Sequence, residues 1–158
     1  MKLFKWLKHA KQRIKKGYSY QDLWSIYDWF FTLIPQMLEE FADEEYIGIP
    51  SFLVLKAEEE HPEMTEEEKY EWGLGQWRIL CKEIAHHLKE GYEPKEQINE
   101  YEEEMFKNWS FEDINKEDDN PELTEKYRKR ELEIFNYQES ELKQGMEMLT
   151  KYLRDLWW

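Results

Sequence analysis

Cations and aromatic rings occur together in a short stretch near the start of this chain. Arg13 and Lys16 are followed by Tyr18 and Trp24, and Trp29 comes five residues later. A guanidinium can bind a phosphate through two hydrogen bonds, and an ammonium supplies a mobile point charge. Nucleobases stack on flat rings, at roughly 1–3 kcal/mol per base in single-stranded nucleic acid complexes. These five residues are the first candidates for a site that holds a phosphorylated ligand.

A second group of the same kind lies at the other end of the chain. Tyr152 and Arg154 are followed closely by Trp157 and Trp158. Chain ends normally fray, and two Trp side chains left in water would forgo the free energy that their burial provides. We therefore expect this end to pack against a neighbouring helix or another subunit, and we add Arg154 to the candidate ligand site.

The charge of the chain is divided unevenly between its start and the remainder. The chain has 22 Lys or Arg and 36 Asp or Glu, a formal net charge of −14. Residues 1–16 hold seven of these bases and no acid, so residues 17–158 hold 15 bases and 36 acids, a charge of −21. Polymeric nucleic acid requires a long positive track, so we predict no such partner. A small anion can still bind, because charges beyond about 8 Å are screened.

Metal and catalytic chemistry have weaker support in the sequence. Glu83 and His86 have the E-x-x-H spacing of di-iron helical bundles, which Glu58 and His61 repeat. However, His61 falls at a predicted helix end, and Glu83 lies beside the apolar stripe of its helix. Cys81 lies within that stripe, which is typical of an inert buried thiol. We therefore expect no metal, no cofactor and no catalytic residue, and the chain is not expected to be an enzyme.

Hydrophobic residues recur at helical spacing along the chain, which predicts an all-α fold. With 158 residues, of which 41% are hydrophobic and 16% aromatic, we expect one domain over residues 1–158. It should be a compact, aromatic-rich bundle of about five to six helices. A basic helix is predicted over 2–16, with Gly17 as a left-handed residue at its end. An acidic connecting region is predicted over 91–121.

Capping residues and prolines predict the remaining helix boundaries. Ser19 with Asp22 has the spacing of a capping box, so a helix should begin at Tyr20, and Pro35 should kink or break it. Pro94 and Pro121 are each expected to begin a helix. A short helix is predicted over 52–60, capped by Ser51, and a longer one from a Thr65–Glu68 capping box to Glu90, with Gly91 as its end. The expected core face of that longer helix is Leu74, Trp77, Cys81, Ile84 and Leu88. The expected apolar side of the last helix is Leu132, Phe135, Leu142, Met146, Leu149, Leu153 and Leu156.

Composition also suggests a compartment and an oligomeric state. The chain has one cysteine, which suits a reducing cytoplasm. It has no apolar stretch near the roughly 20 residues of a membrane span, so we expect a soluble cytoplasmic protein. Eight Trp residues predict surplus apolar surface, and hence a homo-oligomer, either a dimer or a tetramer.

Six short motifs, spread over nearly the whole chain, form a specific combination. They are Arg13-Ile14-Lys15-Lys16-Gly17-Tyr18-Ser19, Asp22-Leu23-Trp24, Pro35-Gln36-Met37-Leu38, Gly48-Ile49-Pro50, Trp77-Arg78-Ile79-Leu80 and Tyr152-Leu153-Arg154-Asp155-Leu156-Trp157. This combination resembles a widespread group of small phage and prophage proteins. In that group an acidic residue usually follows Trp by three positions, where this chain has Tyr27. The acid-rich segments 56–71 and 91–125 have no counterpart in the group.

The resemblance implies a phage origin and a role in host takeover or counter-defence. The group is similar to the anti-CBASS sponges, which are oligomeric proteins that bind cyclic dinucleotide alarm signals without cleaving them. It implies that this chain sequesters such a nucleotide in the host bacterial cytoplasm during infection. The phosphates would be neutralised by Arg13, Lys16 and Arg154, and the bases would stack on Tyr18, Trp24 and Trp29.

Two alternatives come from other classes of protein. One is an inhibitor that binds a host protein through its acidic helices or aromatic surface, including a DNA mimic. The other is an interfacial protein whose basic helix lies on anionic lipid with Phe4 and Trp6 inserted. Because these two side chains can equally pack on the domain, we predict no membrane partner.

Overall fold

The computed structural model describes residues 2–107 and 120–156, with side chains from residue 6 onward. Within this part the chain forms six α-helices, two short 3-10 helices and no strand, so the predicted all-α fold is confirmed. The elements are α1 (Lys2–Lys16), η1 (Asp22–Ser25), α2 (Ile26–Asp43), α3 (Ser51–Glu60), α4 (Glu66–Tyr92), α5 (Glu102–Phe106), α6 (Pro121–Tyr152) and η3 (Leu153–Asp155).

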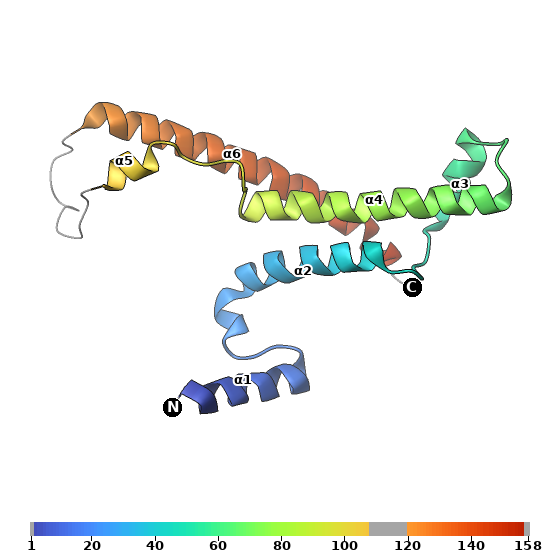
Figure 1. Cartoon of the computed structure of the whole chain (residues 1–158), viewed down its shortest axis with the longest axis horizontal. Coiled ribbons are helices and arrows are strands. Elements are labelled where there is room, and N and C mark those ends of the chain that lie inside the picture. Colours follow the sequence, from blue (N-terminus) through green and yellow to red (C-terminus); the bar gives the residue numbers. More distant parts are fainter. Residues whose placement is uncertain (1, 108–119, 157–158) are drawn as a thin grey trace.

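Helix α4 is the centre of the fold, and α2, α3 and α6 all pack against it. Figure 1 shows α2 and α6 running along α4 on different sides, with α3 folded back over the beginning of α4. Gly91 lies against Leu142, and Trp77 contacts Tyr152. Since the residue number rises along one helix as it falls along the other, α4 and α6 are antiparallel. The N-terminal half of α6 continues past the end of α4 and meets α5 (Figure 1).

Two apolar clusters hold the helices together. The first is formed by Phe31, Leu38, Ile84, Ala85, Leu88 and Leu149. The second is formed by Ala42, Ile47, Leu53, Leu74, Trp77 and Cys81. All five residues predicted for the core face of α4 are buried here, because a helix places every third or fourth side chain on one face. Each fully buried large side chain contributes about 1.5–3 kcal/mol to folding.

The helix boundaries predicted at Gly17, Thr65 and Pro121 agree with the structure. The Thr65 side chain accepts the backbone N–H of Glu68, and the Glu68 carboxylate accepts the N–H of Thr65, so the predicted capping box is present. Gly17 has a φ of +79°, the left-handed conformation predicted for the end of α1. Pro121 begins α6, with Asn120 accepting the N–H of Leu123 as its cap.

The helix predicted to begin at Tyr20 differs from the structure at two places, its beginning and Pro35. Residues 22–25 form the separate 3-10 helix η1, and α2 begins only at Ile26. Helix α2 then continues through Pro35 to Asp43 without a break. A proline inside a helix costs about 3 kcal/mol. Here the Pro35 ring is buried between the turns that carry Phe31 and Leu38, and this burial offsets the cost.

The boundaries predicted at Gly91 and Pro94 are wrong. Helix α4 runs on to Tyr92, and residues 93–101 form a non-helical connection before the short α5. Gly91 serves packing instead, because a Cβ there would lie only 2.7 Å from the backbone nitrogen of Leu142. Ser51 is likewise the first residue of α3 rather than its cap, and its side chain makes no capping bond.

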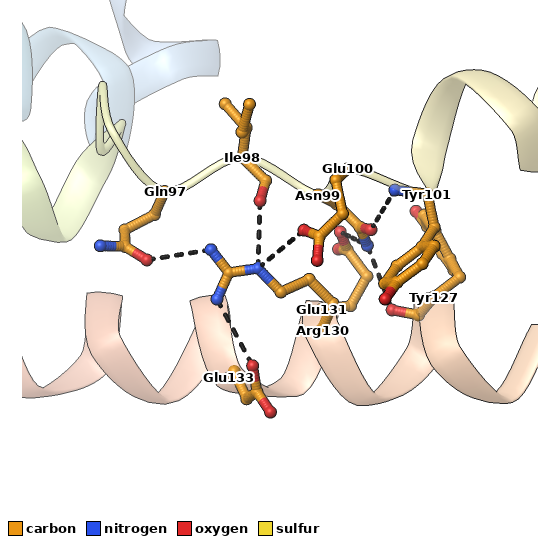
Figure 2. Close-up of polar contacts among 9 residues, drawn as sticks. All are labelled: Gln97, Ile98, Asn99, Glu100, Tyr101, Tyr127, Arg130, Glu131 and Glu133. Carbon is orange, nitrogen blue, oxygen red and sulfur yellow. Dashed lines mark hydrogen bonds and ion pairs between the residues drawn. The ribbon is translucent and has the colours of Figure 1, made fainter.

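Side chains of α6 hold the connection 93–101 in place, as Figure 2 shows. The Arg130 guanidinium donates to the carbonyl of Ile98 at 3.1 Å and to Gln97 at 3.2 Å. The Asn99 amide donates to the carbonyl of Tyr127 at 3.1 Å and to Glu131 at 2.8 Å. These bonds replace the ones that a helix would have formed within the segment, so the connection is extended although Pro94 is a common first helical residue.

The predicted apolar side of the last helix is only partly buried. Leu149 is buried and Leu142 is half-buried, but Leu132 and Phe135 are exposed. The reason is that the first half of α6 extends beyond α4 and has only α5 and the connection 93–101 beside it. Tyr152 packs on Phe52 and Trp77, as expected for a C-terminal end that is held in place. Trp157 and Trp158 lie outside the described residues, as do residues 108–119 of the acidic connecting region.

Helix α1 lies apart from the bundle. Among the described elements it packs on none of the helices α2–α6, and Figure 1 shows it separated from α2 by the turn at residues 17–21. Two side-chain contacts fix this turn. Gln12 accepts the backbone N–H of Tyr20 at 3.0 Å, and Arg13 pairs with Asp22. The N-terminal helix is thus attached to the body through its own turn and not through packing.

Candidate ligand-binding site

The Arg13 guanidinium is already paired with a carboxylate of the chain. Its Nε donates to Asp22 Oδ2 at 3.0 Å and its Nη2 to Asp22 Oδ1 at 2.6 Å. Asp22 also accepts the backbone N–H of Ser19 at 2.7 Å. Hydrogen bonds from Arg13 and then Ser19 hold the pKa of the Asp22 carboxyl well below its usual range. A phosphate would have to compete with Asp22 for Arg13, so the structure gives this residue first of all a positioning role in the turn.

Lys16 and Tyr18 come together as predicted. The Lys16 ammonium lies 6.0 Å from the centre of the Tyr18 ring, within the range of a cation–π contact. Both side chains are exposed. In the part of the chain that the structure describes, the ion pairs include none for Lys8, Lys11, Lys15 or Lys16. Four cations of α1 are therefore open to an anionic ligand.

The two candidate Trp side chains are accessible but not enclosed. Trp24, in η1, is 84% exposed, and Trp29, in the first half of α2, is about half as exposed. Among the ring contacts of the described residues, none involves either Trp. Their rings are thus available for stacking, yet a ligand lying on them would be covered on one side only.

Arg154 lies at a different end of the molecule from the other five candidates. It belongs to η3, immediately after Tyr152, which packs on Phe52 of α3. Figure 1 places this C-terminal end beside the end of α2 that leads to α3, whereas α1 lies below the beginning of α2. Within one chain, therefore, Arg154 does not join Arg13 and Lys16 in a common site.

Two hollows in the described surface are lined by other residues than those predicted. One is an open acidic depression along α2, lined by Gln36, Glu39, Glu40, Asp43 and Glu44. The other is a groove of about 180 Å³ between α3 and α4. It is lined by Phe52, Leu53, Lys56, Gln76, Ile79, Leu80, Glu83 and Tyr152. We call it the α3–α4 groove.

The α3–α4 groove left a weak signal in the sequence. Ile79 and Leu80 are apolar residues beside the core stripe of α4. Phe52 is an apolar residue beside the buried Leu53 on α3. Leu80 packs against both apolar clusters, whereas Ile79 and Phe52 widen the apolar face beyond the core. Sequence spacing shows that extra face, but it does not show that α3 folds back on α4 and turns it into a groove.

The buried polar groups in the bundle have structural roles. His87 lies between α4 and α6, with its Nδ1 2.7 Å from Glu141 and its Nε2 2.9 Å from the amide of Gln144. Burial raises the pKa of the Cys81 thiol to about 12, so this group is a poor nucleophile. No group of three or more potential metal-ligating side chains occurs among the described residues.

No family model, no curated protein and no solved structure matches this chain. No helix within the described ranges is long and apolar enough to cross a membrane. The geometry of the N-terminal unit, defined as residues 6–25 of α1, the following turn and η1, is therefore the basis for a functional proposal.

Proposed function

We propose that this chain is a non-enzymatic counter-defence protein that binds and sequesters a cyclic dinucleotide. The observation that carries this proposal is the N-terminal unit, in which the Lys16 ammonium lies 6.0 Å from the centre of the Tyr18 ring and Trp24 is exposed. Three further lysines of α1 have no acidic partner among the described ion pairs. Helix α1 of this unit lies apart from the acidic bundle, so a small anion can approach its lysines. A long polyanion would instead meet the repulsion of the remaining surface.

Lys16 and Tyr18 are the central pair of the proposed site. The ammonium supplies charge for a phosphate, and the ring supplies a face for the attached base. Trp24 offers a second face, and the Arg13–Asp22 pair fixes the turn between them. In this arrangement Arg13 acts mainly as a positioning residue, whereas the unpaired lysines make the phosphate contacts.

The affinity that a sponge needs indicates that the open surface of a single N-terminal unit is not sufficient to hold the nucleotide. A sponge needs a Kd near the nanomolar range, or about −12 kcal/mol. Two stacked bases at roughly 1–3 kcal/mol each and two charge-assisted bonds at roughly 1.5–3 kcal/mol each reach that value only at their upper limits. A second wall over the ligand, supplied by another copy of the chain, would close the site and bring the bonds toward those limits.

Thermal shift with a panel of cyclic dinucleotides and trinucleotides tests the proposal. At a hundredfold excess over Kd, the right ligand raises the free energy of unfolding by about 2.7 kcal/mol, which corresponds to a rise in Tm of roughly 5–10 °C. Intact nucleotide should be recovered after heat denaturation. A cleaved product, or no shift with any member of the panel, would overturn the proposal.

Matched variants locate the site. Lys16→Ala should weaken binding about tenfold or more, since it removes one charge-assisted bond. Lys143→Ala is its control, because Lys143 is an exposed lysine on α6, far along the chain from the unit. Tyr18→Ala should weaken binding similarly, with exposed Tyr46→Ala as its control. Equal losses in the variants and their controls would contradict the assigned site.

The host-protein inhibitor is less well supported by the structure. Its best candidate surface is the acidic depression on α2, but two of the acids there already have cationic partners within the chain. Glu39 pairs with Lys89, and Asp43 pairs with Lys82. A DNA mimic needs a row of unpaired charges, so this partial neutralisation favours nucleotide capture.

A further inference from the structure

Helix α1 carries an apolar face with nothing packed on it. Leu7, Ala10 and Ile14 share one face at helical spacing, and Trp6 lies beside Leu7 in the sequence. Ile14 is 86% exposed, and Trp6 and Leu7 are also exposed. A 15-residue helix without tertiary packing is marginal in water, so α1 would gain stability from a surface that covers this face.

The α3–α4 groove is an apolar surface that also lacks a cover. Its exposed apolar side chains are Phe52 and Ile79, and Leu55 lies nearby on α3, exposed as well. Leu80 and Tyr152 form deeper parts of the lining. Amphipathic helices bind grooves of this kind through residues spaced three and four apart, which is the spacing that α1 offers.

The charge of the body around the groove is opposite to that of α1. The groove lining itself holds one acid and one base, Glu83 and Lys56, and the Lys151 ammonium lies 4.7 Å from the centre of the Tyr152 ring. Lys56 already lies 3.8 Å from Glu60, whereas Glu83 has no partner among the ion pairs of the described residues. Helix α1 has seven bases and no acid in residues 1–16, and residues 17–158 carry a charge of −21, so the body as a whole attracts the cationic helix.

The groove of the same chain is out of reach of α1. The Arg13–Asp22 pair and the Gln12–Tyr20 hydrogen bond fix the turn that follows α1. That turn leads into the beginning of α2, whereas α3, which lines the groove together with α4, follows the other end of α2 (Figure 1). An α1 that fills the groove must therefore come from another molecule.

We propose that α1 of one copy docks in the α3–α4 groove of a second copy. Direct pairing of two α1 helices would place seven bases against seven, and anionic lipid would repel the body of charge −21. Docking on the groove avoids both problems and covers two apolar surfaces at once. When the exchange is reciprocal, each groove is filled and the assembly closes as a symmetric dimer.

The mass of the full chain in solution, measured by light scattering without nucleotide, tests this proposal. Wild type should be dimeric at micromolar concentration, and the docking constant should weaken at least tenfold in Ile14→Asp and in Ile79→Asp. Leu132→Asp is the matched control, because Ile79 and Leu132 are each 59% exposed but Leu132 lies on the distant half of α6. A monomeric wild type, or an Ile79→Asp variant that associates like wild type, would overturn the proposal.

Mixing the two variants distinguishes the groove from other interfaces. Ile79→Asp keeps an intact α1 and Ile14→Asp keeps an intact groove, so an equimolar mixture should form a heterodimer with one intact contact. Pairing between two α1 helices would give no such rescue. Circular dichroism confirms folding of each variant, since Ile14 contacts no other helix and Ile79 lies on the surface.

A covalent trap and a vesicle assay complete the test. Ile14→Cys mixed with Ile79→Cys should form a disulfide between copies, because the native Cys81 is buried and does not compete. Co-sedimentation with phosphatidylglycerol vesicles that is lost in Ile14→Asp, together with a monomeric wild type, would assign α1 to a lipid surface instead. Because none of these measurements contains a nucleotide, failure of docking is separate from failure of the proposed ligand capture.

Discussion

At the scale of single residues, the most consequential contact is the pair between Arg13 and Asp22. The chain itself supplies the carboxylate that occupies the guanidinium, at 2.6 and 3.0 Å. An isolated Arg in a basic, aromatic segment indicates phosphate binding, but Asp22 lies only nine residues away on the other side of a turn. The pair therefore defines the shape of the N-terminal unit and leaves the phosphate contacts to lysines.

The pair predicts a pH-dependent turn. The pKa of Asp22 is lowered from 3.8 in the folded chain. Its contribution to stability is therefore present above about pH 4 and is lost as the pH falls through the lower folded value. The Nε resonance of Arg13 and the amide resonance of Ser19 should keep their positions from pH 7 to 5 and move at lower pH. Asp22→Asn should show the displaced positions already at pH 7, and identical spectra for both proteins would contradict the pair.

Cys81 gives a second prediction at this scale. Burial raises its pKa from 9.0 to about 12, so the thiolate fraction at pH 8 is far below that of an ordinary thiol. Reaction with a disulfide reagent at pH 8 should be at least about tenfold slower in the folded protein than in guanidinium, since the smaller thiolate fraction outweighs the greater nucleophilicity of a high-pKa thiolate. Fast labelling of the native chain would show that the second apolar cluster opens readily.

At the scale of elements, the close approach of α4 and α6 depends on two glycines, Gly91 and Gly145, of which Gly91 is the more tightly placed. A Cβ at Gly91 would lie 2.7 Å from the Leu142 nitrogen and 2.8 Å from its Cα. Backbone atoms cannot move aside as a flexible side chain can, so Gly91→Ala should lower the free energy of unfolding by about 1–3 kcal/mol. Urea unfolding measures the change.

Gly75 supplies the matched control on the same helix. A Cβ there meets nothing within 4 Å. Gly75→Ala should therefore raise the free energy of unfolding by as much as about 1 kcal/mol, since alanine is the better helix former. If both substitutions were stabilising, α4 and α6 would have to lie further apart than the structure shows.

The sequence predicted elements well where local rules act alone. The Thr65 capping box and the buried face of α4 depend on residues three or four apart, and both are confirmed. Pro35 and Pro94 depend on surroundings that local rules do not contain. Packing around Pro35 offsets the missing hydrogen bond. In the segment after Pro94, the backbone carbonyl of Ile98 accepts a hydrogen bond from Arg130 of α6.

The candidate site likewise has a part that local spacing predicts and a part that depends on how the helices pack. Lys16 and Tyr18 are two residues apart, and the structure brings them together. Arg154 is far from both in the chain, so its place depends on how α2, α4 and α6 are arranged. No spacing in the sequence could show that α1 lies apart from the bundle or that α3 and α4 enclose a groove.

At the scale of the whole molecule, the separation of charge has a structural counterpart. Among the described helices, the cationic α1 packs on none of α2–α6, and the acidic remainder forms the bundle. Docking of α1 on a second copy would bring the N-terminal unit of one chain to the body of another, at the groove that Tyr152 lines. That body would then supply the second wall that nanomolar affinity requires.

The same separation predicts how salt affects stability. In the Ile79→Asp background, which has 37 acids, replacement of the six lysines of α1 by Gln leaves 16 bases and changes the net charge from −15 to −21. Self-repulsion grows with net charge and is screened by salt. The Tm of this variant should therefore fall by several degrees below that of its parent at 10 mM NaCl and approach it at 500 mM. The Ile79→Asp background is used for both proteins, so that docking does not contribute.

Replacement of the same six lysines by Arg is the control, because it changes the side chains and keeps the net charge of the Ile79→Asp parent at −15. This variant should melt like its parent at every salt concentration, since α1 does not pack on the bundle. A loss of Tm that persists at 500 mM NaCl in the Gln variant would mean that α1 supports the bundle by packing. Such a result would place α1 within the fold, and its cations would then no longer be free for a ligand or a second copy.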